Sequence, residues 1–321
     1  MQTNVIRIGT RESVLALWQT NWVVDRLQSH HPDTHFQVVQ VHTKGDRVRD
    51  VPLFRAGGVG LFVKELEVAL LNEEIDLAVH SLKDMPSQVP PELSIAATPE
   101  RADPRDALVS RLGLPLASLP RGARVGTSSR RRAAQLLAFR PDFQIVNLRG
   151  NVDTRLRKAK GEEYDAVVLA SAGLIRLDRA GRITEVLSPE VMLPAGGQGA
   201  LAVQVRAADE RAGSLVAPLN HLPTRTTTTA ERAFLARLGG GCHVPIAAYA
   251  VLEDDQLWLR ALVGSPDGRT IIRGERRGTA LQAQHCPGLD STGSLGQELA
   301  EELLAQGAAD LLDSLEEECD N

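Results

Sequence analysis

The sequence predicts an α/β protein of two lobes, followed by a small α+β domain. Its 321 residues, 43% of them hydrophobic, can form several cores. Up to about residue 206, short apolar runs typical of buried strands alternate with longer segments of helical period, as in βαβ units. After about residue 221, one helix is followed by successive strands. The predicted domains are residues 1–99 with 199–218, residues 100–198, and residues 219–321.

The first lobe begins with a strand, a helix and a second strand, predicted at residues 5–9, 13–27 and 36–42. Residues 43–60 are rich in glycine and lack periodicity, which indicates a long loop of the kind that covers sites or is disordered. An amphipathic helix at residues 61–71 then leads into an apolar strand at residues 75–79. This alternation predicts a largely parallel sheet.

Strands of the second lobe are predicted at residues 107–109, 124–126, 144–146 and 166–169. The chain then returns to the first lobe, where residues 200–203 again resemble a strand. In the C-terminal domain, Thr228 and Glu231 have the spacing of a capping box, which predicts the start of a helix. Further strands are expected at residues 246–252, 257–263 and 270–273, before a final helix at residues 295–315.

Composition excludes several classes of protein. The amino terminus lacks the charged and apolar regions of a secretory signal, and no apolar run approaches the roughly 18 residues of a membrane helix. The three cysteines, Cys242, Cys286 and Cys319, lack the spacing of a zinc site, and their odd number argues against a disulfide framework. We therefore expect a reduced, cytoplasmic protein without a bound metal or a membrane segment.

Charge is distributed unevenly along the chain. Basic side chains far outnumber acidic ones between residues 101 and 160, whereas residues 290–321 contain acidic side chains and no basic one. This asymmetry suggests an electric field directed at an anionic ligand. Most of the basic residues are arginines, and a GC-rich genome explains much of that bias. Arginine is nevertheless the side chain that binds carboxylates through two parallel hydrogen bonds.

One predicted strand ends in side chains suited to chemistry. The apolar run at residues 75–79 is followed by His80, Lys83 and Asp84, and Pro86 then interrupts regular structure. Ligands of open α/β sheets bind beyond the carboxyl ends of strands, so we expect residues 80–84 at the functional edge. The alternative is that Asp84 caps a turn or a short helix, which is a common role of aspartate.

Arginines and hydroxyls follow three predicted strands of the second lobe. Thr127 and Ser129 lie between a strand and a helix, where unpaired backbone N–H groups attract anions. Residues 148–155 repeat this arrangement, and Arg176 follows the next strand. A ligand with several carboxylates would explain three such strand ends, whereas the alternative for each is a solvated basic face.

A third candidate site is Cys242, which follows Gly239, Gly240 and Gly241. Glycines permit positive φ and remove side-chain bulk, so a large group could approach the thiol. The alternative is a free cysteine that packs in the core as a small hydrophobic residue.

Several motifs, taken together and in order, resemble those of the porphobilinogen deaminase (hydroxymethylbilane synthase) family. They are RESVLAL at 11–17, GLFVKELE at 60–67, HSLKDMP at 80–86, DPRD at 103–106, VGTSS at 125–129, LRGN at 148–151, PAGGQG at 194–199 and GGGCHVPIA at 239–247. The resemblance implies two lobes like those of periplasmic binding proteins, with a cleft between them. It also implies a transferase that joins four porphobilinogen molecules head to tail into hydroxymethylbilane and releases ammonia each time.

The resemblance assigns roles to individual residues. A dipyrromethane cofactor would be joined through a thioether to Cys242, and Asp84 would be the catalytic acid and base. Cofactor carboxylates would be held by Lys83, Ser129, Arg131 and Arg132. Substrate carboxylates would be bound by Arg11, Ser13, Thr127, Arg149, Arg155 and Arg176. For His80 a structural hydrogen bond is expected instead of a role as a base.

The chain departs from the family at one predicted loop. Where family members carry lysines, this sequence has Arg55, which keeps the charge, and Val59, which does not. The difference bears on how tightly the loop closes and not on the reaction. The resemblance further implies a cytoplasmic monomer whose partner is porphobilinogen, with no metal, nucleic acid or membrane.

Two other functions are compatible with parts of the sequence. A non-catalytic binding module for small acids would explain a cleft and the arginines, but it gives no reason for three glycines before Cys242. Nucleic-acid binding through residues 101–160 would need stacking platforms, and only 3% of the chain is aromatic.

Overall fold

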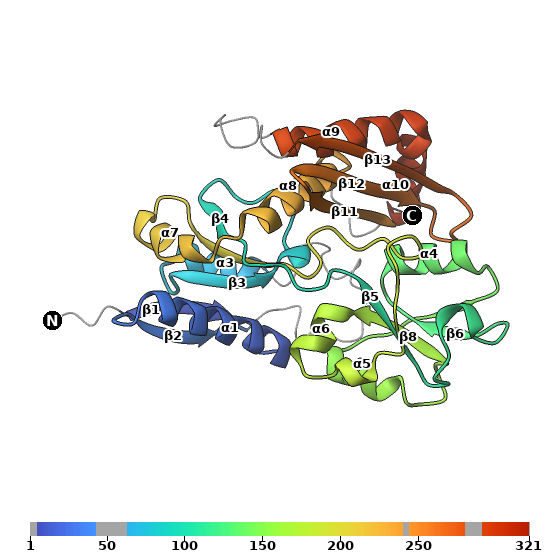
Figure 1. The fold of residues 1–321 in the computed structure, drawn as a ribbon, viewed down its shortest axis with the longest axis horizontal. Coiled ribbons are helices and arrows are strands. Elements are labelled where there is room, and N and C mark those ends of the chain that lie inside the picture. Colours follow the sequence, from blue (N-terminus) through green and yellow to red (C-terminus); the bar gives the residue numbers. More distant parts are fainter. Residues whose placement is uncertain (1–4, 43–62, 240–243, 280–290, 321) are drawn as a thin grey trace. The chain divides into compact units, whose positions relative to one another are not determined.

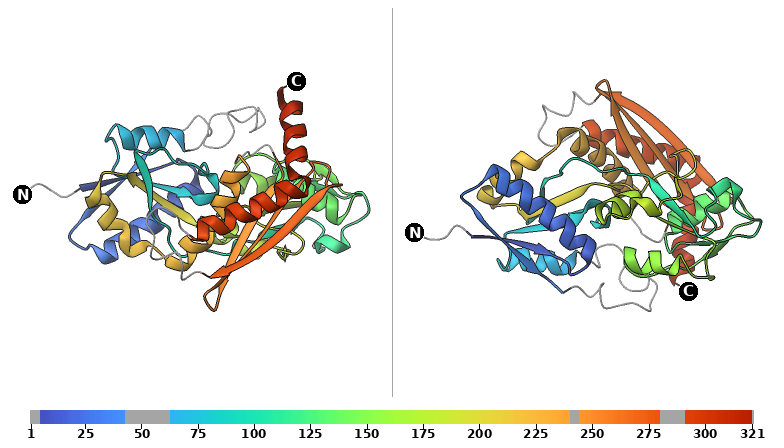
Figure 2. Two further views of the ribbon diagram at one scale, coloured as in Figure 1. Left: turned by 90° about the horizontal axis from the view of Figure 1, so that it is seen from above. Right: turned by 60° about the horizontal axis from the view of Figure 1, so that its bottom comes forward.

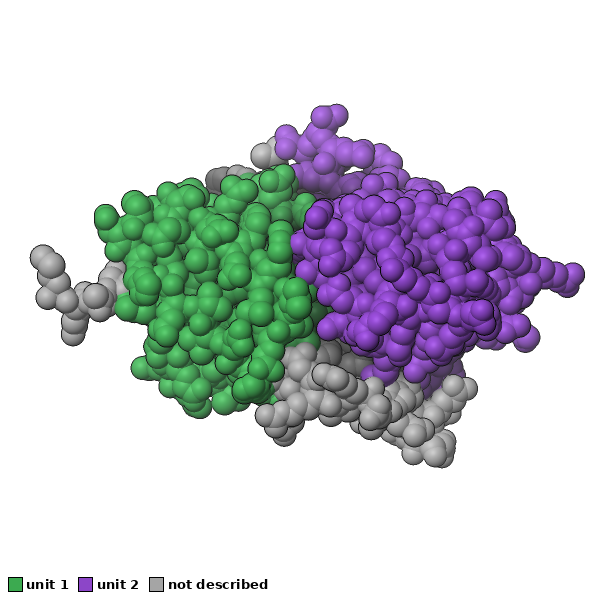
Figure 3. Space-filling model, turned by 90° about the horizontal axis from the view of Figure 1, so that it is seen from below, with its two compact units in different colours: residues 1–102, 199–225 green, residues 103–198, 226–321 purple. Residues whose placement is uncertain are grey.

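The computed structural model describes residues 5–42, 63–239, 244–279 and 291–320 (Figure 1). The chain divides into two compact units, which are coloured separately in Figure 3. Unit 1 comprises residues 1–102 and 199–225, and unit 2 comprises residues 103–198 and 226–321.

Unit 1 is built on a five-stranded mixed sheet in the order β2-β1-β3-β10-β4. Its strands are β1 (Val5–Thr10), β2 (His35–Gln40), β3 (Leu77–Ser81), β4 (Leu93–Ala97) and β10 (Leu201–Arg206). β1 runs parallel to β2 and β3, but β10 is antiparallel to both β3 and β4. The prediction of a largely parallel sheet was therefore wrong for this half, because β10 returns from a distant part of the sequence and enters in the opposite direction.

Helices cover both faces of this sheet. On one face, α1 (Val14–His30) and α7 (Glu210–Val216) pack against the strands, with Val23 and Leu27 fully buried. On the other face, α3 (Lys64–Leu71) buries Leu66 and Leu70 against Ile75. Side chains from both faces of β3 are thus buried, which explains its nearly continuous apolar sequence.

The second sheet, in unit 2, is also five-stranded and mixed, in the order β7-β6-β8-β5-β9. Its strands are β5 (Asp106–Ser110), β6 (Arg124–Gly126), β7 (Gln144–Val146), β8 (Ala166–Ala170) and β9 (Glu185–Val186). β6 is parallel to β7 and β8, whereas β5 is antiparallel to β8 and β9. Three helices follow the parallel strands, namely α4 (Arg130–Phe139), α5 (Val152–Lys158) and α6 (Ser171–Arg176).

The C-terminal part of unit 2 is an antiparallel three-stranded sheet packed against helices. Its strands are β11 (Ile246–Glu253), β12 (Gln256–Gly264) and β13 (Ile271–Thr279). Its core joins Phe234 of α8 (Leu222–Arg237) to Leu299 of α9 (Ser291–Leu303) and to Leu259 of β12. The predicted α/β sheets and α+β C-terminal part are confirmed.

Two predicted helix boundaries were wrong. The helix expected to begin near Thr228 begins at Leu222, so Glu231 lies inside α8 and not in a capping box. The final helix is two helices, α9 and α10 (Ala309–Asp320), which meet at a bend through one π-helical turn (Figure 2). Gly307 has φ +105° in that turn, a conformation that glycine adopts without strain.

The C-terminal sheet and the second α/β sheet pack together inside unit 2. Leu193 packs with Ala247 and Leu262, and the turn at Gly268 lies against the backbone of α4. A separate third domain with a boundary near residue 219 therefore stays a prediction. Among the described residues, no helix is long and apolar enough to span a bilayer.

Candidate active site

One edge of the second sheet gathers several of the predicted site residues. β6, β7 and β8 are parallel, so their carboxyl ends, at Gly126, Val146 and Ala170, lie along the same edge. The chain after these ends carries Thr127, Ser129, Arg131, Arg132, Arg149, Arg155 and Arg176. The topology thus brings together the three strand ends that the sequence singled out.

The hydroxyls after β6 shape the start of α4. Ser129 is the N-cap residue, and its Oγ accepts a hydrogen bond from the Arg132 N–H at 3.4 Å. Thr127 Oγ1 accepts from the Ser129 N–H at 3.1 Å. Ser128 Oγ donates to the Leu148 carbonyl at 2.6 Å, which ties this turn to the segment after β7. The turn is therefore held by its own hydroxyls.

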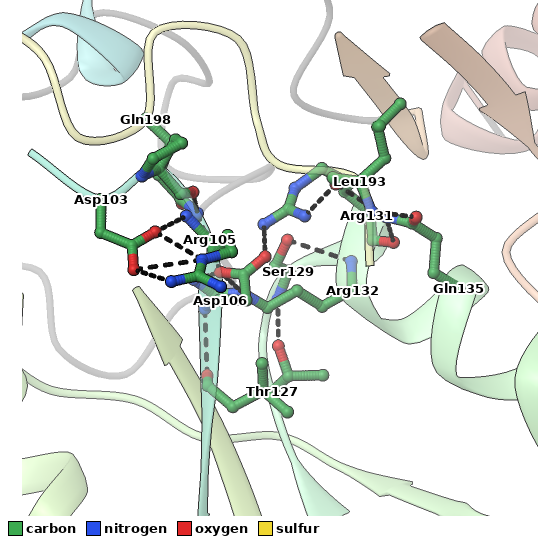
Figure 4. Close-up of polar contacts among 12 residues, drawn as sticks. Asp103, Arg105, Asp106, Thr127, Ser129, Arg131, Arg132, Gln135, Leu193 and Gln198 are labelled. Carbon is green, nitrogen blue, oxygen red and sulfur yellow. Dashed lines mark hydrogen bonds and ion pairs between the residues drawn. The ribbon is translucent and has the colours of Figure 1, made fainter. Parts of the chain in front are cut away.

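Arg131 and Arg132 share one buried carboxylate, that of Asp106 (Figure 4). Arg131 Nη2 lies 2.8 Å from Asp106 Oδ2, and Arg132 Nη2 lies 2.7 Å from Asp106 Oδ1. Each guanidinium also donates to a backbone carbonyl, Arg131 to Leu193 at 2.6 Å and Arg132 to Val168 at 3.0 Å. Both arginines are only 6% exposed, so they are buried at this edge of the sheet.

The two arginines keep Asp106 ionised. Burial alone would raise the pKa of Asp106, but the charges and hydrogen bonds of Arg131 and Arg132 outweigh burial and lower it to about 2. Burial lowers the pKa of the Arg131 guanidinium, and Asp106 opposes that shift. Gln198 Nε2 adds a hydrogen bond to Asp106 Oδ1 at 3.0 Å.

Sequence reasoning did not assign a role to Asp106. The residue begins β5, which is antiparallel to β8, and it pairs with Ala170 at the end of β8. The start of β5 therefore lies at the same edge as the ends of its parallel neighbours. The only signal was its place in the DPRD motif, which indicates a family but not an orientation.

A second turn at this edge holds Arg149 and Arg155. Gly150 has φ +115°, and Asn151 caps α5 by accepting from the Thr154 N–H at 2.9 Å. Arg155 Nε donates to the Gly150 carbonyl at 2.7 Å, so its guanidinium lies beside the turn. Arg149 and Arg155 are both half-buried.

Arg176 is the third arginine contribution to the edge. It ends α6, and burial lowers its pKa to about 10. At neutral pH the guanidinium is still charged, and a partly desolvated cation interacts more strongly with an anion than one in bulk water does.

In unit 1 the predicted catalytic carboxylate follows the central strand. Asp84 is half-buried and lies in a 3₁₀ turn, Leu82–Asp84, directly after β3. Lys83 is exposed in the same turn. The half-buried Arg11 and Ser13 follow β1, which is parallel to β3, so they belong to the same sheet edge as Asp84. Ser13 also caps α1, accepting from the Ala16 N–H at 3.2 Å.

His80 does not lie at the functional edge, contrary to expectation, because β3 extends through Ser81. It is buried inside the strand, with Nε2 3.0 Å from Gln204 Oε1. Gln204 Nε2 in turn donates to Glu67 Oε1 at 2.9 Å. The expected structural hydrogen bond is therefore confirmed. Burial lowers the pKa of His80 to about 4; the bond to Gln204 opposes this shift, and the charge of Arg11 adds to it.

One polar contact near Asp84 was not foreseen. Gln19 of α1 is buried and donates from Nε2 to Ser81 Oγ at 3.0 Å. It thereby attaches α1 to the end of β3, just before the turn that carries Asp84. A glutamine within an otherwise regular helix gives no sequence signal of such a role.

Several predicted features lie outside the described residues, namely Cys242, Arg55 and Val59. Leading to Cys242, α8 ends at Arg237, and Gly239 has φ +80°, as a helix-terminating glycine requires. Within the ranges that the structure describes, no group of three or more His, Cys, Asp or Glu side chains could hold a metal ion.

Comparison with known proteins identifies the family. The family model "Porphobilinogen deaminase, dipyromethane cofactor binding domain" matches residues 6–214, and "Porphobilinogen deaminase, C-terminal domain" matches residues 225–305. The porphobilinogen deaminase of Roseiflexus sp. (strain RS-1) is 55% identical over 305 residues, covering 95% of this chain and 97% of its own. That of Brevibacillus brevis is 50% identical over 307 residues, covering 95% and 96%.

Similarity to solved structures is more distant. The periplasmic aliphatic sulphonate binding protein SsuA from Escherichia coli is 15% identical with a TM-score of 0.38, covering 75% of this chain and 72% of that one. At this distance the likeness decides nothing about the site. The two family models and the near relatives, in contrast, span almost the whole chain. The chain therefore belongs to the porphobilinogen deaminase family, and it condenses porphobilinogen into hydroxymethylbilane with a dipyrromethane cofactor.

Proposed function

We propose that this chain performs the reaction with Asp84 as its proton-transferring carboxylate and with the cofactor attached to Cys242. The half-buried position of Asp84, directly after the central strand of its sheet, supports the first assignment. A carboxylate held there stabilises the positive charge that develops as ammonia leaves the aminomethyl group of porphobilinogen. The same group can transfer protons, which typically contributes about 10²–10⁴ in rate.

The donors at the two sheet edges fit a cofactor and substrates rich in carboxylates. At both edges cationic side chains and hydroxyls converge, and each charged hydrogen bond contributes about 1.5–3 kcal/mol. Cofactor carboxylates would be held by Lys83, Ser129, Arg131 and Arg132. Substrate carboxylates would be bound by Arg11, Ser13, Thr127, Arg149, Arg155 and Arg176. When bound, the cofactor supplies a pyrrole end to which the next unit is joined.

The observation that carries this proposal is the convergence of three parallel strand ends on one arginine-rich edge. A simple solvated basic face would leave its guanidiniums exposed, whereas Arg131 and Arg132 are buried and Arg176 is half-buried with a lowered pKa. Their desolvation suits them to bind an anionic ligand in place of water. We further propose that the chain acts as a cytoplasmic monomer whose partner is porphobilinogen, without nucleic acid or membrane.

Denaturing mass spectrometry tests the role of Cys242. Protein expressed in cells that make porphobilinogen should be heavier than its sequence by one dipyrromethane. Cys242→Ser protein should lack the added mass, and the matched control Cys286→Ser should keep it. Active wild-type protein at its plain sequence mass, or an adduct that persists in Cys242→Ser, would refute the attachment.

The kinetics of Asp84→Asn test the catalytic carboxylate. The substitution keeps the size of the side chain but removes its charge and its ability to transfer a proton. We expect kcat to fall by about 10²–10⁴ with a nearly unchanged KM, because binding by the arginines remains. Glu92→Gln, at an exposed carboxylate, is the control and should match the wild type. A kcat within about threefold of the wild type would exclude Asp84 as the acid and base.

A further inference from the structure

We propose that Asp106 is a positioning residue that orients Arg131 and Arg132 toward the cofactor. This inference rests on the proposed function, in which those two arginines hold cofactor carboxylates. Asp106 is fully buried at the start of β5, and its carboxylate lies between the two guanidiniums (Figure 4).

Arg131 and Arg132 are consecutive residues of α4, and consecutive side chains of an α-helix point about 100° apart. Without a shared partner, their guanidiniums would diverge. Asp106 brings them together by giving one oxygen to each, Oδ2 to Arg131 and Oδ1 to both Nε and Nη2 of Arg132.

The two guanidiniums also have little rotational freedom. Each guanidinium is held from two directions, by Asp106 and by a backbone carbonyl, that of Leu193 for Arg131 and that of Val168 for Arg132. A guanidinium has five N–H donors, and these contacts occupy two on Arg131 and three on Arg132. The remaining donors are therefore presented in fixed directions. A pre-oriented arginine loses less conformational entropy when it binds a carboxylate.

Two adjacent buried cations repel each other, and the charge of Arg132 contributes to lowering the pKa of Arg131. Asp106 relieves this repulsion, and the three groups together keep one net positive charge to attract an anion. Asp106 is itself fixed, because Gln198 Nε2 donates both to its Oδ1 and to the Pro104 carbonyl, at 3.0 and 2.7 Å.

The rate of cofactor loading tests the proposal. The full-length Asp106→Asn chain, made in cells that cannot make porphobilinogen, would be incubated with porphobilinogen. The mass adduct would then be followed over time by denaturing mass spectrometry. We expect loading of the folded fraction to slow by about tenfold or more, because asparagine neither neutralises the arginines nor accepts from both.

Asp76→Asn is the matched control. Asp76 also lies between two arginines, Arg7 and Arg206, but at the opposite end of β3 from Asp84. It should lower the melting temperature as Asp106→Asn does, yet load within about twofold of the wild type. Loss of stability alone would therefore not imitate the predicted result.

The possible outcomes separate this inference from the proposed function. If Asp106→Asn does not fold, Asp106→Glu takes its place, since it keeps the charge but displaces the carboxylate by one methylene group. A folded Asp106 variant that melts early yet loads at the wild-type rate would show that Asp106 is only structural. If Arg131→Gln and Arg132→Gln also load normally, the proposed role of the arginines fails instead.

Discussion

His80 gives the protein a sensitivity to acid that is independent of catalysis. In the folded chain its pKa is about 4, against about 6.5 when unfolded, because burial disfavours the charged ring. Between these values the unfolded chain binds a proton that the folded chain does not. The contribution of His80 to stability is therefore complete above about pH 6.5 and is lost as the pH falls toward 4.

We expect His80→Asn to flatten the pH dependence of stability. Asparagine can still donate to Gln204 but does not titrate. Between pH 6.5 and 4, the free energy of unfolding should therefore fall by up to about 3 kcal/mol less in the variant than in the wild type. Urea denaturation at pH 7 and at pH 4.5 measures the difference. If the wild type and the variant lose the same free energy of unfolding between these two pH values, the ring must be protonated in the folded protein as readily as in the unfolded one.

At the residue scale, the sequence predicted which side chains follow strand ends, but not which side chains contact one another. The residue types at Asp84, Thr127 and Ser129 follow strand ends, and a strand end can be recognised from hydrophobic pattern alone. Asp106 could not be found in this way, because its partners depend on which direction β5 runs in the sheet. The end of β3 was predicted two residues too early, at residue 79 instead of Ser81, so His80 was expected beyond the strand.

At the scale of elements, α4 depends on a turn from another sheet. Gly268, between β12 and β13, has φ +69°, and a Cβ there would lie 2.7 Å from the Ala138 backbone nitrogen. The obstacle is helix backbone, which cannot move aside as a flexible side chain can. The C-terminal sheet thereby supports the helix that begins with Ser129 and carries Arg131.

Gly268→Ala should therefore destabilise the protein by about 1–3 kcal/mol, as overpacking typically does. Gly113→Ala separates the two causes, because Gly113 has the same φ of +69° but nothing within 4 Å of the added Cβ. The control should show only the smaller cost of the left-handed backbone, about 1 kcal/mol. Chemical denaturation of both variants measures the difference, and equal losses would mean that the contact with α4 contributes nothing.

Elements were predicted mainly from periodicity, and the predictions were wrong where the direction of a strand or a special backbone conformation decided the outcome. The runs that became β1, β5, β8 and β12 were apolar enough to identify. β4 was missed because Leu93–Ala97 is short and follows two prolines. The break at Gly307 was missed because an isolated glycine in a helical pattern is usually tolerated.

At the scale of unit 2, Glu231 connects three segments that are distant in sequence. From inside α8, its buried carboxylate accepts from the Gly197 N–H at 2.7 Å and from the Ala250 N–H at 2.8 Å. The segment that precedes β10 is thereby joined to the first strand of the C-terminal sheet. Because both N–H groups are buried, water could not readily replace the Glu231 carboxylate as their acceptor.

Glu231→Gln should cost about 2–3 kcal/mol, because an amide presents a donor where a second acceptor is needed. The exposed pair of Arg237 and Glu301 supplies the control, and Glu301→Gln should change stability by less than 1 kcal/mol. Melting curves at equal protein concentration compare the two. A loss in Glu231→Gln no larger than in the control would mean that the buried contacts are dispensable.

For the molecule as a whole, the order of the strands in unit 1 has a consequence for its synthesis. β10 lies between β3 and β4, yet it is made about a hundred residues after them. The sheet of unit 2 emerges from the ribosome in the meantime, in one uninterrupted stretch of chain. Until β10 is made, we expect β3 to be unpaired on one side. At that stage a chaperone would protect the nascent chain from aggregation.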